Sequence, residues 1–124
     1  MTQPLALVLY ERLLPGTQLV NRLQDLGYRV QVVEDPSALI QTAEITGPLL
    51  LFADLESSRA NVIEIIAQLR QNASTHHLPV VAFYAEGKQD LEDLTKAAGI
   101  TLLASESALS NHLPQVLEQA LRVD

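Results

Sequence analysis

The sequence has no cysteine, no tryptophan and only eight lysine and arginine residues among its 124. Without cysteine, disulfides, zinc–thiolate sites and thiol catalysis are excluded. Fifteen acidic residues give a formal net charge of −7 and an isoelectric point near 4.8. A phosphate backbone or an anionic membrane is bound by clustered basic residues. We therefore expect neither nucleic acid nor a membrane as a partner.

Long apolar runs and linkers are also missing. No apolar run approaches the roughly 20 residues of a membrane helix, and the N-terminal stretch MTQPLALVLYERLL has no basic region before its short apolar run. We therefore expect a cytoplasmic protein. The chain shows no internal repeat, low-complexity segment or Ser/Gly linker. Its length fits one ordinary domain over residues 1–124.

Apolar runs of strand length alternate with segments of helical period. We predict strands at 5–9, 28–33, 48–54, 78–85 and 100–104. We predict helices from Pro15 to Leu26, from Asp35 as N-cap to Thr46, and at about 60–72, 88–98 and 113–121. In the first helix Leu19, Val20, Leu23 and Leu26 share one stripe, and Gly27 is expected as a left-handed C-terminal cap. Pro114 is expected in the first turn of the last helix.

Five strands alternating with five helices predict a parallel sheet in a three-layer α/β/α sandwich. In such sheets the functional crevice lies outside the carboxyl ends of the strands. For this chain the relevant positions are Tyr10-Glu11, Asp54, Tyr84-Ala85 and Ser105-Glu106.

In length, element order and the place of Asp54, the chain resembles the receiver domain of bacterial two-component response regulators. The resemblance implies a flavodoxin-like fold with strand order 2-1-3-4-5. It also implies that Asp54 occupies the phosphoacceptor position and that Tyr10-Glu11 occupies the position of an acidic pair that binds Mg²⁺. The ordinary alternative for Asp54 is an aspartate that begins a loop by hydrogen-bonding its own backbone.

Three further positions of the family carry other residues here. Tyr84 stands in place of a small hydroxyl residue, Leu103 in place of the aromatic switch residue, and Glu106 in place of a lysine. A glutamate facing a phosphoryl group repels it, whereas the lysine attracts it. Ser105 is the alternative residue for the lysine position, and it supplies no cation either.

These departures predict a degenerate receiver, or pseudo-receiver, similar to the docking modules of cyanobacterial clock proteins. We expect a phosphorelay-type signalling module, not an enzyme, that acts by protein–protein contact with phosphorylation impaired or lost. The first alternative is an orthodox receiver that a histidine kinase phosphorylates on Asp54, with Mg²⁺ held by Glu11 and Asp54. With Tyr10 replacing one acid, we expect at most a weak magnesium site. A remote alternative is a flavin-like small-ligand domain.

The expected partner is a histidine kinase or an output or clock-type signalling protein, and a homodimer is a further alternative. By the resemblance, it docks on the face formed by the helix at 88–98, the fifth strand and the last helix, near Lys88 and Lys96. The adjacent histidines His76 and His77 point in different directions on most backbones. We therefore expect them, like His112, on the surface and not at a metal.

Overall fold

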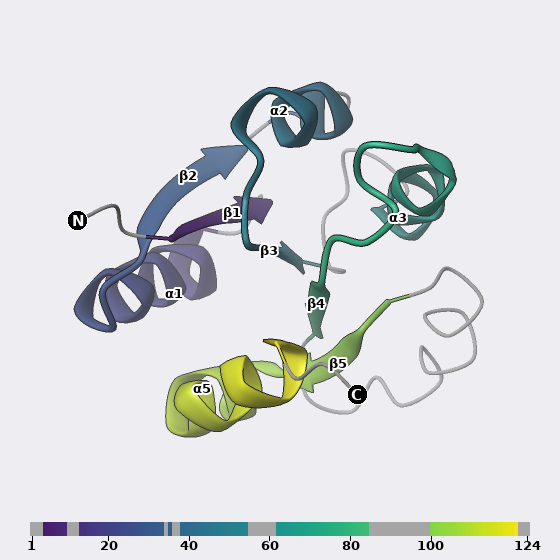
Figure 1. The fold of residues 1–124 in the computed structure, drawn as a ribbon. Helices are drawn as coiled ribbons and strands as arrows, with labels where there is room; N and C mark the ends of the chain where they lie inside the picture. The colour runs from purple at the N-terminus through teal and green to yellow at the C-terminus, as the bar shows by residue number, and fades with distance from the viewer. Residues whose placement is uncertain are drawn as a thin grey trace.

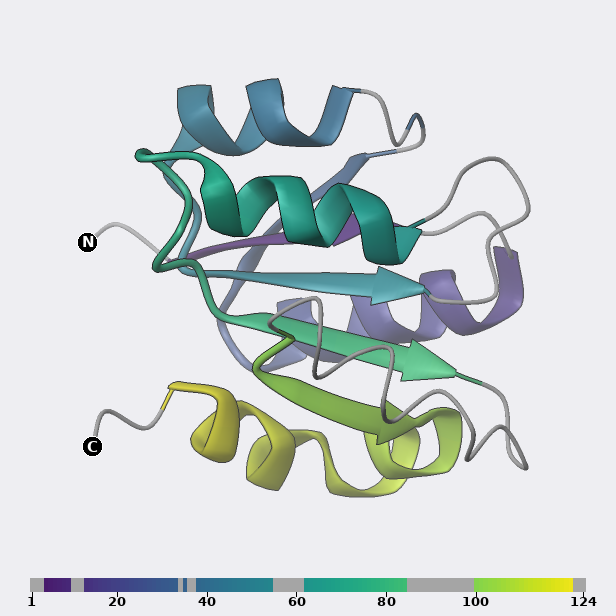
Figure 2. The ribbon, with the colours of Figure 1, turned by 90° about the vertical axis from the view of Figure 1, so that its right-hand side faces the viewer.

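The computed structural model describes residues 4–9, 13–33, 35, 38–54, 62–84 and 100–121. Its five strands form one parallel sheet in the order β2-β1-β3-β4-β5 (Figure 1). They are β1 (Leu5–Leu9), β2 (Arg29–Val33), β3 (Leu50–Asp54), β4 (Val80–Tyr84) and β5 (Leu102–Ser105). The predicted parallel sheet and strand order are confirmed. The arrowheads of the strands point to the same side of the sheet (Figure 2). We call this side, where the carboxyl ends of the strands lie, the carboxyl edge.

Helices cover both faces of the sheet, which confirms the three-layer architecture (Figure 1). The described helices are α1 (Leu13–Asp25), α2 (Leu39–Thr46), α3 (Val62–Gln71) and α5 (Glu106–Leu121). One core cluster joins the sheet to α1 and α5, and a second joins it to α2 and α3. The helix predicted at 88–98, with Lys88 and Lys96, lies outside the described residues.

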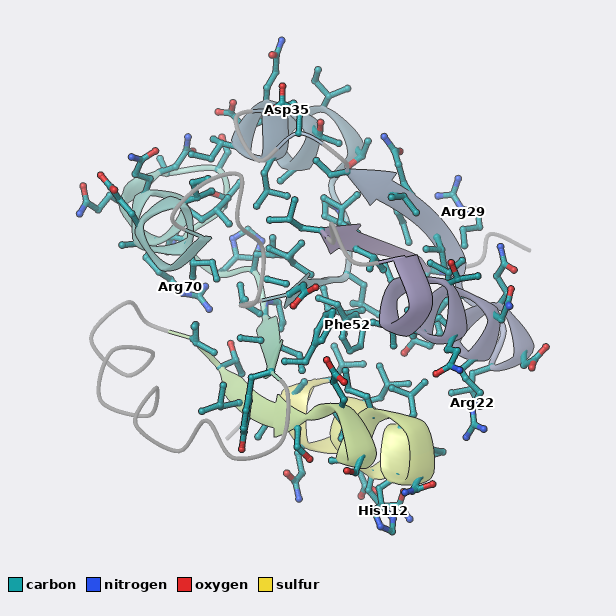
Figure 3. All side chains as sticks on the ribbon, turned by 180° about the vertical axis from the view of Figure 1, so that it is seen from behind. Arg22, Arg29, Asp35, Phe52, Arg70 and His112 are labelled. Carbon is teal, nitrogen blue, oxygen red and sulfur yellow. The ribbon has the colours of Figure 1, made fainter. Side chains whose placement is uncertain are left out.

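The three central strands are almost entirely apolar because both of their faces are covered. Every residue of β3 is buried, and its side chains alternate between the two core clusters. Phe52 points into the cluster beneath α1 and α5 and lies near the centre of the molecule (Figure 3). The edge strand β2 keeps the predicted alternation, since Arg29 and Gln31 are exposed and the valines between and after them are at least half-buried. Because side chains alternate along a strand, burial of these faces determines which side chains point into the core at the carboxyl edge.

The end of α1 forms the cap that glycine predicts. Gly27 has a φ of 91° and its N–H donates to the Gln24 carbonyl, while the Tyr28 N–H donates to the Leu23 carbonyl. This is the Schellman arrangement, in which glycine takes the left-handed conformation at no steric cost. The prediction that Leu26 belongs to the buried stripe was wrong. It follows the last helical residue and its side chain is 44% exposed.

Two helix starts differ from the prediction. The first helix begins at Leu13, not at Pro15. The second begins at Leu39 with Ala38 as N-cap, so the prediction of Asp35 as N-cap was wrong. The Asp35 carbonyl accepts a hydrogen bond from the Ala38 N–H at 3.0 Å, which makes a turn before the helix.

The junction between β5 and α5 also differs from the prediction. The strand spans Leu102–Ser105, whereas 100–104 was predicted, and α5 begins at once with Glu106. A break at His112, with φ of −133° and ψ of 31°, divides α5 into two pieces. Pro114 therefore stands near the start of the second piece, as predicted, because proline tolerates the first turn of a helix. The first piece was not predicted.

The other predicted strands were slightly too long. β2 begins at Arg29 and not at Tyr28, β3 begins at Leu50 and not at residue 48, and β4 begins at Val80 and not at residue 78. At the amino ends of the strands, the Arg70 side chain links α3 to the connection before β4 through hydrogen bonds. Its Nη1 donates to the His76 and Leu78 carbonyls at 2.9 and 2.6 Å. Its Nη2 donates to Thr101 Oγ1 at 3.0 Å, just before β5.

Candidate functional site

Asp54 is the last residue of β3 and lies at the carboxyl edge of the sheet, as predicted. Its side chain is 0% exposed. Its register partner on β4 is Phe83, which is 1% exposed. Because register partners on adjacent parallel strands point to the same face, the carboxyl group and the aromatic ring are neighbours. The position predicted to accept a phosphoryl group is therefore closed to solvent in this structure.

Tyr84 and Ser105 are register partners one residue further toward the carboxyl edge. Tyr84 ends β4 and is half-buried, so it stands at the edge where the sequence placed it. Leu103 lies within β5 opposite Ala82 and is also half-buried. A leucine here has no aromatic ring to change rotamer between buried and exposed positions.

Ser105 and Glu106 have different roles in the structure. The Ser105 Oγ accepts a hydrogen bond from the Ala108 N–H at 3.2 Å, the bond that an N-cap serine makes to the third residue of a helix. Glu106 is then the first residue of α5, and its Oε1 is buried. An acidic residue in the first turn interacts favourably with the helix dipole. Glu106 thus suits the start of α5 while placing a carboxyl group where the resemblance expects a lysine.

Tyr10 and Glu11, the predicted acidic-pair position, lie outside the described residues. Within the described ranges, no three His, Asp or Glu side chains gather closely enough to hold a metal ion. The predicted magnesium site, which includes Glu11, therefore stays a prediction.

The histidines lie where the sequence placed them, away from this edge. His76 and His77 are exposed in the turn before β4, with ring centroids 5.5 Å apart in an edge-to-face arrangement. His76 Nδ1 is hydrogen-bonded to the Ala73 carbonyl oxygen at 2.9 Å. His112 is exposed at the break in α5 (Figure 3). These contacts agree with a surface position.

Phe83 is the site residue that sequence reasoning missed. The sequence contained a signal for this pairing. When the ends of the third and fourth strands are aligned, the residue before Tyr84 pairs with Asp54. That pairing becomes visible only when the two strands are adjacent and their ends are known to one residue. Sequence patterns alone do not give strand ends with that accuracy.

Comparisons with known proteins identify the fold. No family model and no curated protein matches the sequence. The chemotaxis protein CheY4 of Vibrio cholerae has a TM-score of 0.86 at 18% identity, with 97% of this chain and 100% of that chain covered. The receiver domain of a Pseudomonas aeruginosa sensor histidine kinase, which has a magnesium ion in its active-site cleft, gives 0.85 at 18% identity over 97% and 98%. A Thermotoga maritima response regulator gives 0.80 at 16% identity over 97% and 98%. Similarity at this identity establishes the flavodoxin-like fold of receiver domains.

Proposed function

We propose that residues 1–124 form one receiver-like signalling domain of the two-component type, which acts by protein–protein contact and is phosphorylated poorly or not at all. The observation that carries this proposal is Asp54, which keeps the place of the phosphoacceptor but is fully buried beside Phe83. The fold is that of receiver domains from a sensor kinase and a chemotaxis protein. Because the domain would act through contact with a partner and not through catalysis, the proposal also implies that it is not an enzyme.

The chemistry of transfer supports impaired phosphorylation. A carboxylate that attacks phosphorus must reach the donor in line, and cations must neutralise the charge that gathers there. Asp54 is closed to solvent, and Glu106 adds a carboxyl group near the same edge instead of an ammonium group. A phosphoryl group on Asp54 would require the surrounding side chains to move and would gain no attraction from residue 106.

Phosphorylation is tested with acetyl phosphate and Mg²⁺, and in parallel with beryllofluoride and Mg²⁺. We expect no added phosphoryl group in the intact mass and no shift of the Asp54 and Tyr84 amide resonances. The Vibrio cholerae chemotaxis protein, treated identically, is the positive control for the reagents. Stoichiometric labelling that disappears in Asp54→Asn would overturn the proposal. It would favour the orthodox switch, with Mg²⁺ held by Glu11 and Asp54.

A gain-of-function variant tests the cause. The double substitution Tyr84→Thr and Glu106→Lys restores a small hydroxyl and a cation, so we expect Asp54-dependent labelling to increase at least severalfold over the unchanged chain. The control Glu106→Gln removes the charge without adding a cation and should label less than the double variant. Equal labelling of all variants would show that residues 84 and 106 do not limit the reaction.

We further propose a cytoplasmic location and a protein partner of the histidine kinase, output or clock type. One similar structure is itself part of a sensor histidine kinase. The proposed face combines the segment around Lys88 and Lys96 with β5 and α5. None of the described helices has both the length and the apolar composition needed to cross a membrane. Charge reversal at Lys88 and Lys96 should remove a specific partner in pull-downs, and unchanged capture would exclude this face.

A further inference from the structure

The turn between α3 and β4 brings two histidine rings together. His76 and His77 are both exposed, and their ring centroids lie 5.5 Å apart with an interplanar angle of 79°. Adjacent side chains point in different directions on most backbones, and on that ground the sequence predicted no metal at this pair. The observed ring contact removes that objection. The pair precedes β4 and therefore lies at the opposite end of this strand from the carboxyl edge (Figure 2).

The His76 ring is held in the tautomer that a metal ion requires. Its Nδ1 is hydrogen-bonded to the Ala73 carbonyl oxygen at 2.9 Å. A carbonyl oxygen only accepts, so Nδ1 carries the hydrogen and Nε2 of the neutral ring carries the lone pair. Metal-binding histidines are commonly oriented in this way, by a hydrogen bond from the other ring nitrogen. The arrangement therefore offers Nε2 of His76 as a ligand atom.

Hydrogen bonds fix the backbone of the turn that carries the pair. The N–H groups of Thr75 and His76 both donate to the Asn72 carbonyl, at 3.1 and 2.9 Å. The buried Thr75 hydroxyl donates to the Leu69 carbonyl at 2.7 Å. The Arg70 guanidinium donates to the His76 carbonyl at 2.9 Å. Because the backbone is already fixed, bringing both rings to one ion costs less conformational entropy than in a flexible chain.

The spacing of the two rings suits one ion between them. Zinc binds each imidazole nitrogen at about 2.0–2.1 Å in tetrahedral geometry, which places the centres of two bound rings roughly 5 Å apart. The observed spacing of 5.5 Å is close to this value, so rotations of the two exposed side chains suffice to direct both rings at one ion. Within the ranges that the structure describes, no third His, Asp or Glu joins the pair. Water or a ligand from another molecule would fill the remaining positions.

We propose that His76 and His77 form an open binding site for a divalent transition-metal ion, for which Zn²⁺ is the probe. Imidazole nitrogen suits zinc, copper and nickel, whereas magnesium prefers oxygen ligands. The site is therefore distinct from the predicted magnesium position at Glu11 and Asp54. The net charge of −7 favours the approach of a cation to the chain. This site does not depend on the proposed signalling function.

Titration of the full chain with zinc chloride tests the site, with calorimetry and the imidazole NMR resonances as readouts. We expect one zinc ion per chain and shifts of the His76 and His77 ring resonances, and magnesium chloride should produce neither. His76→Ala and His77→Ala should each weaken zinc binding by about tenfold or more. The control His112→Ala changes the third histidine of the chain, which is also exposed, and should leave binding unchanged. No binding, or equal effects of the three substitutions, would refute the site.

A synthetic peptide of residues 71–79 distinguishes a folded site from any pair of adjacent histidines. The peptide has both histidines but lacks the contacts with α3 that fix the turn. We expect the full chain to bind zinc at least severalfold more tightly than the peptide. Zinc should then also raise the free energy of unfolding in urea, since it binds the folded state more tightly than the unfolded state. Equal affinities of chain and peptide, or an unchanged urea midpoint, would show adventitious binding only and would contradict the proposal.

Discussion

Asp54 and Phe83 are register partners on β3 and β4, and their side chains are 0% and 1% exposed. A carboxyl group at the carboxyl edge of a parallel sheet is usually placed to meet a ligand. Here an aromatic ring lies beside it and water is excluded. This relationship is the observation on which the proposed function rests.

Phe83 should contribute strongly to stability because it is one of the largest fully buried side chains. We expect Phe83→Ala to lower the free energy of unfolding by about 3–5 kcal/mol, through lost burial and the cavity left behind. Tyr84→Ala is the matched control at the next position, where the side chain is half-buried. It should cost clearly less in urea denaturation. Similar losses at both positions would contradict the burial of Phe83.

Ser105 should stabilise α5 through its side chain. Ser105→Ala removes the acceptor for the Ala108 N–H, and we expect a loss of about 0.5–2 kcal/mol in the free energy of unfolding. In the control Ser74→Ala, the backbone N–H that donates to Asn72 Oδ1 remains, so stability should hardly change. A neutral Ser105→Ala would show that Ser105 does not cap the helix.

Position 70 should require arginine for full stability. Burial lowers the pKa of the Arg70 guanidinium, which nevertheless stays protonated at neutral pH. Its two terminal nitrogens donate to the His76 and Leu78 carbonyls and to Thr101 Oγ1. A lysine ammonium does not span these acceptors, so we expect Arg70→Lys to cost about 1–3 kcal/mol in chemical denaturation. Arg22 is exposed, so Arg22→Lys should hardly change the free energy of unfolding. Equal losses of stability in the two variants would contradict the role of the two donating nitrogens of Arg70.

Tyr28 should make stability fall at alkaline pH. Burial raises the pKa of the Tyr28 hydroxyl above its ordinary value of 10.0. The folded state then holds the proton more tightly than the unfolded state. This contribution is fully present below pH 10 and is lost as pH rises through the folded-state pKa.

The comparison of Tyr28→Phe with the unchanged chain isolates this effect. We expect urea denaturation on both sides of pH 10 to show a weaker alkaline loss of stability in Tyr28→Phe. Tyr84→Phe serves as the control for removing a tyrosine hydroxyl elsewhere. An unchanged pH dependence in Tyr28→Phe would mean that Tyr28 titrates alike in both states.

The fold was predictable from the sequence because several signals agreed. Continuous apolar runs such as LLLFAD correspond to strands covered on both faces, and Gly27 takes the left-handed conformation expected of a helix cap. Errors occurred where one residue type serves two purposes. Asp35 is both a common N-cap and a common turn residue, and Ser105 both ends a strand and caps a helix.

The candidate site was only partly predictable. The sequence located Asp54, Tyr84, Ser105 and Glu106 at the carboxyl edge, since strand ends follow from apolar runs and turns. It did not show that Asp54 is closed to solvent, that Phe83 is its register partner, or that Ser105 and Glu106 divide into a cap and a first helical residue.

The sequence by itself determined the strands, their covered faces and the edge at which the acidic residue stands, because hydrophobic period and turn chemistry are local properties. Only the tertiary structure decided which residues stand side by side across strands and which are shut off from water. Register and burial depend on contacts between segments distant in the chain, so Asp54 and Phe83 became neighbours only when β3 and β4 paired.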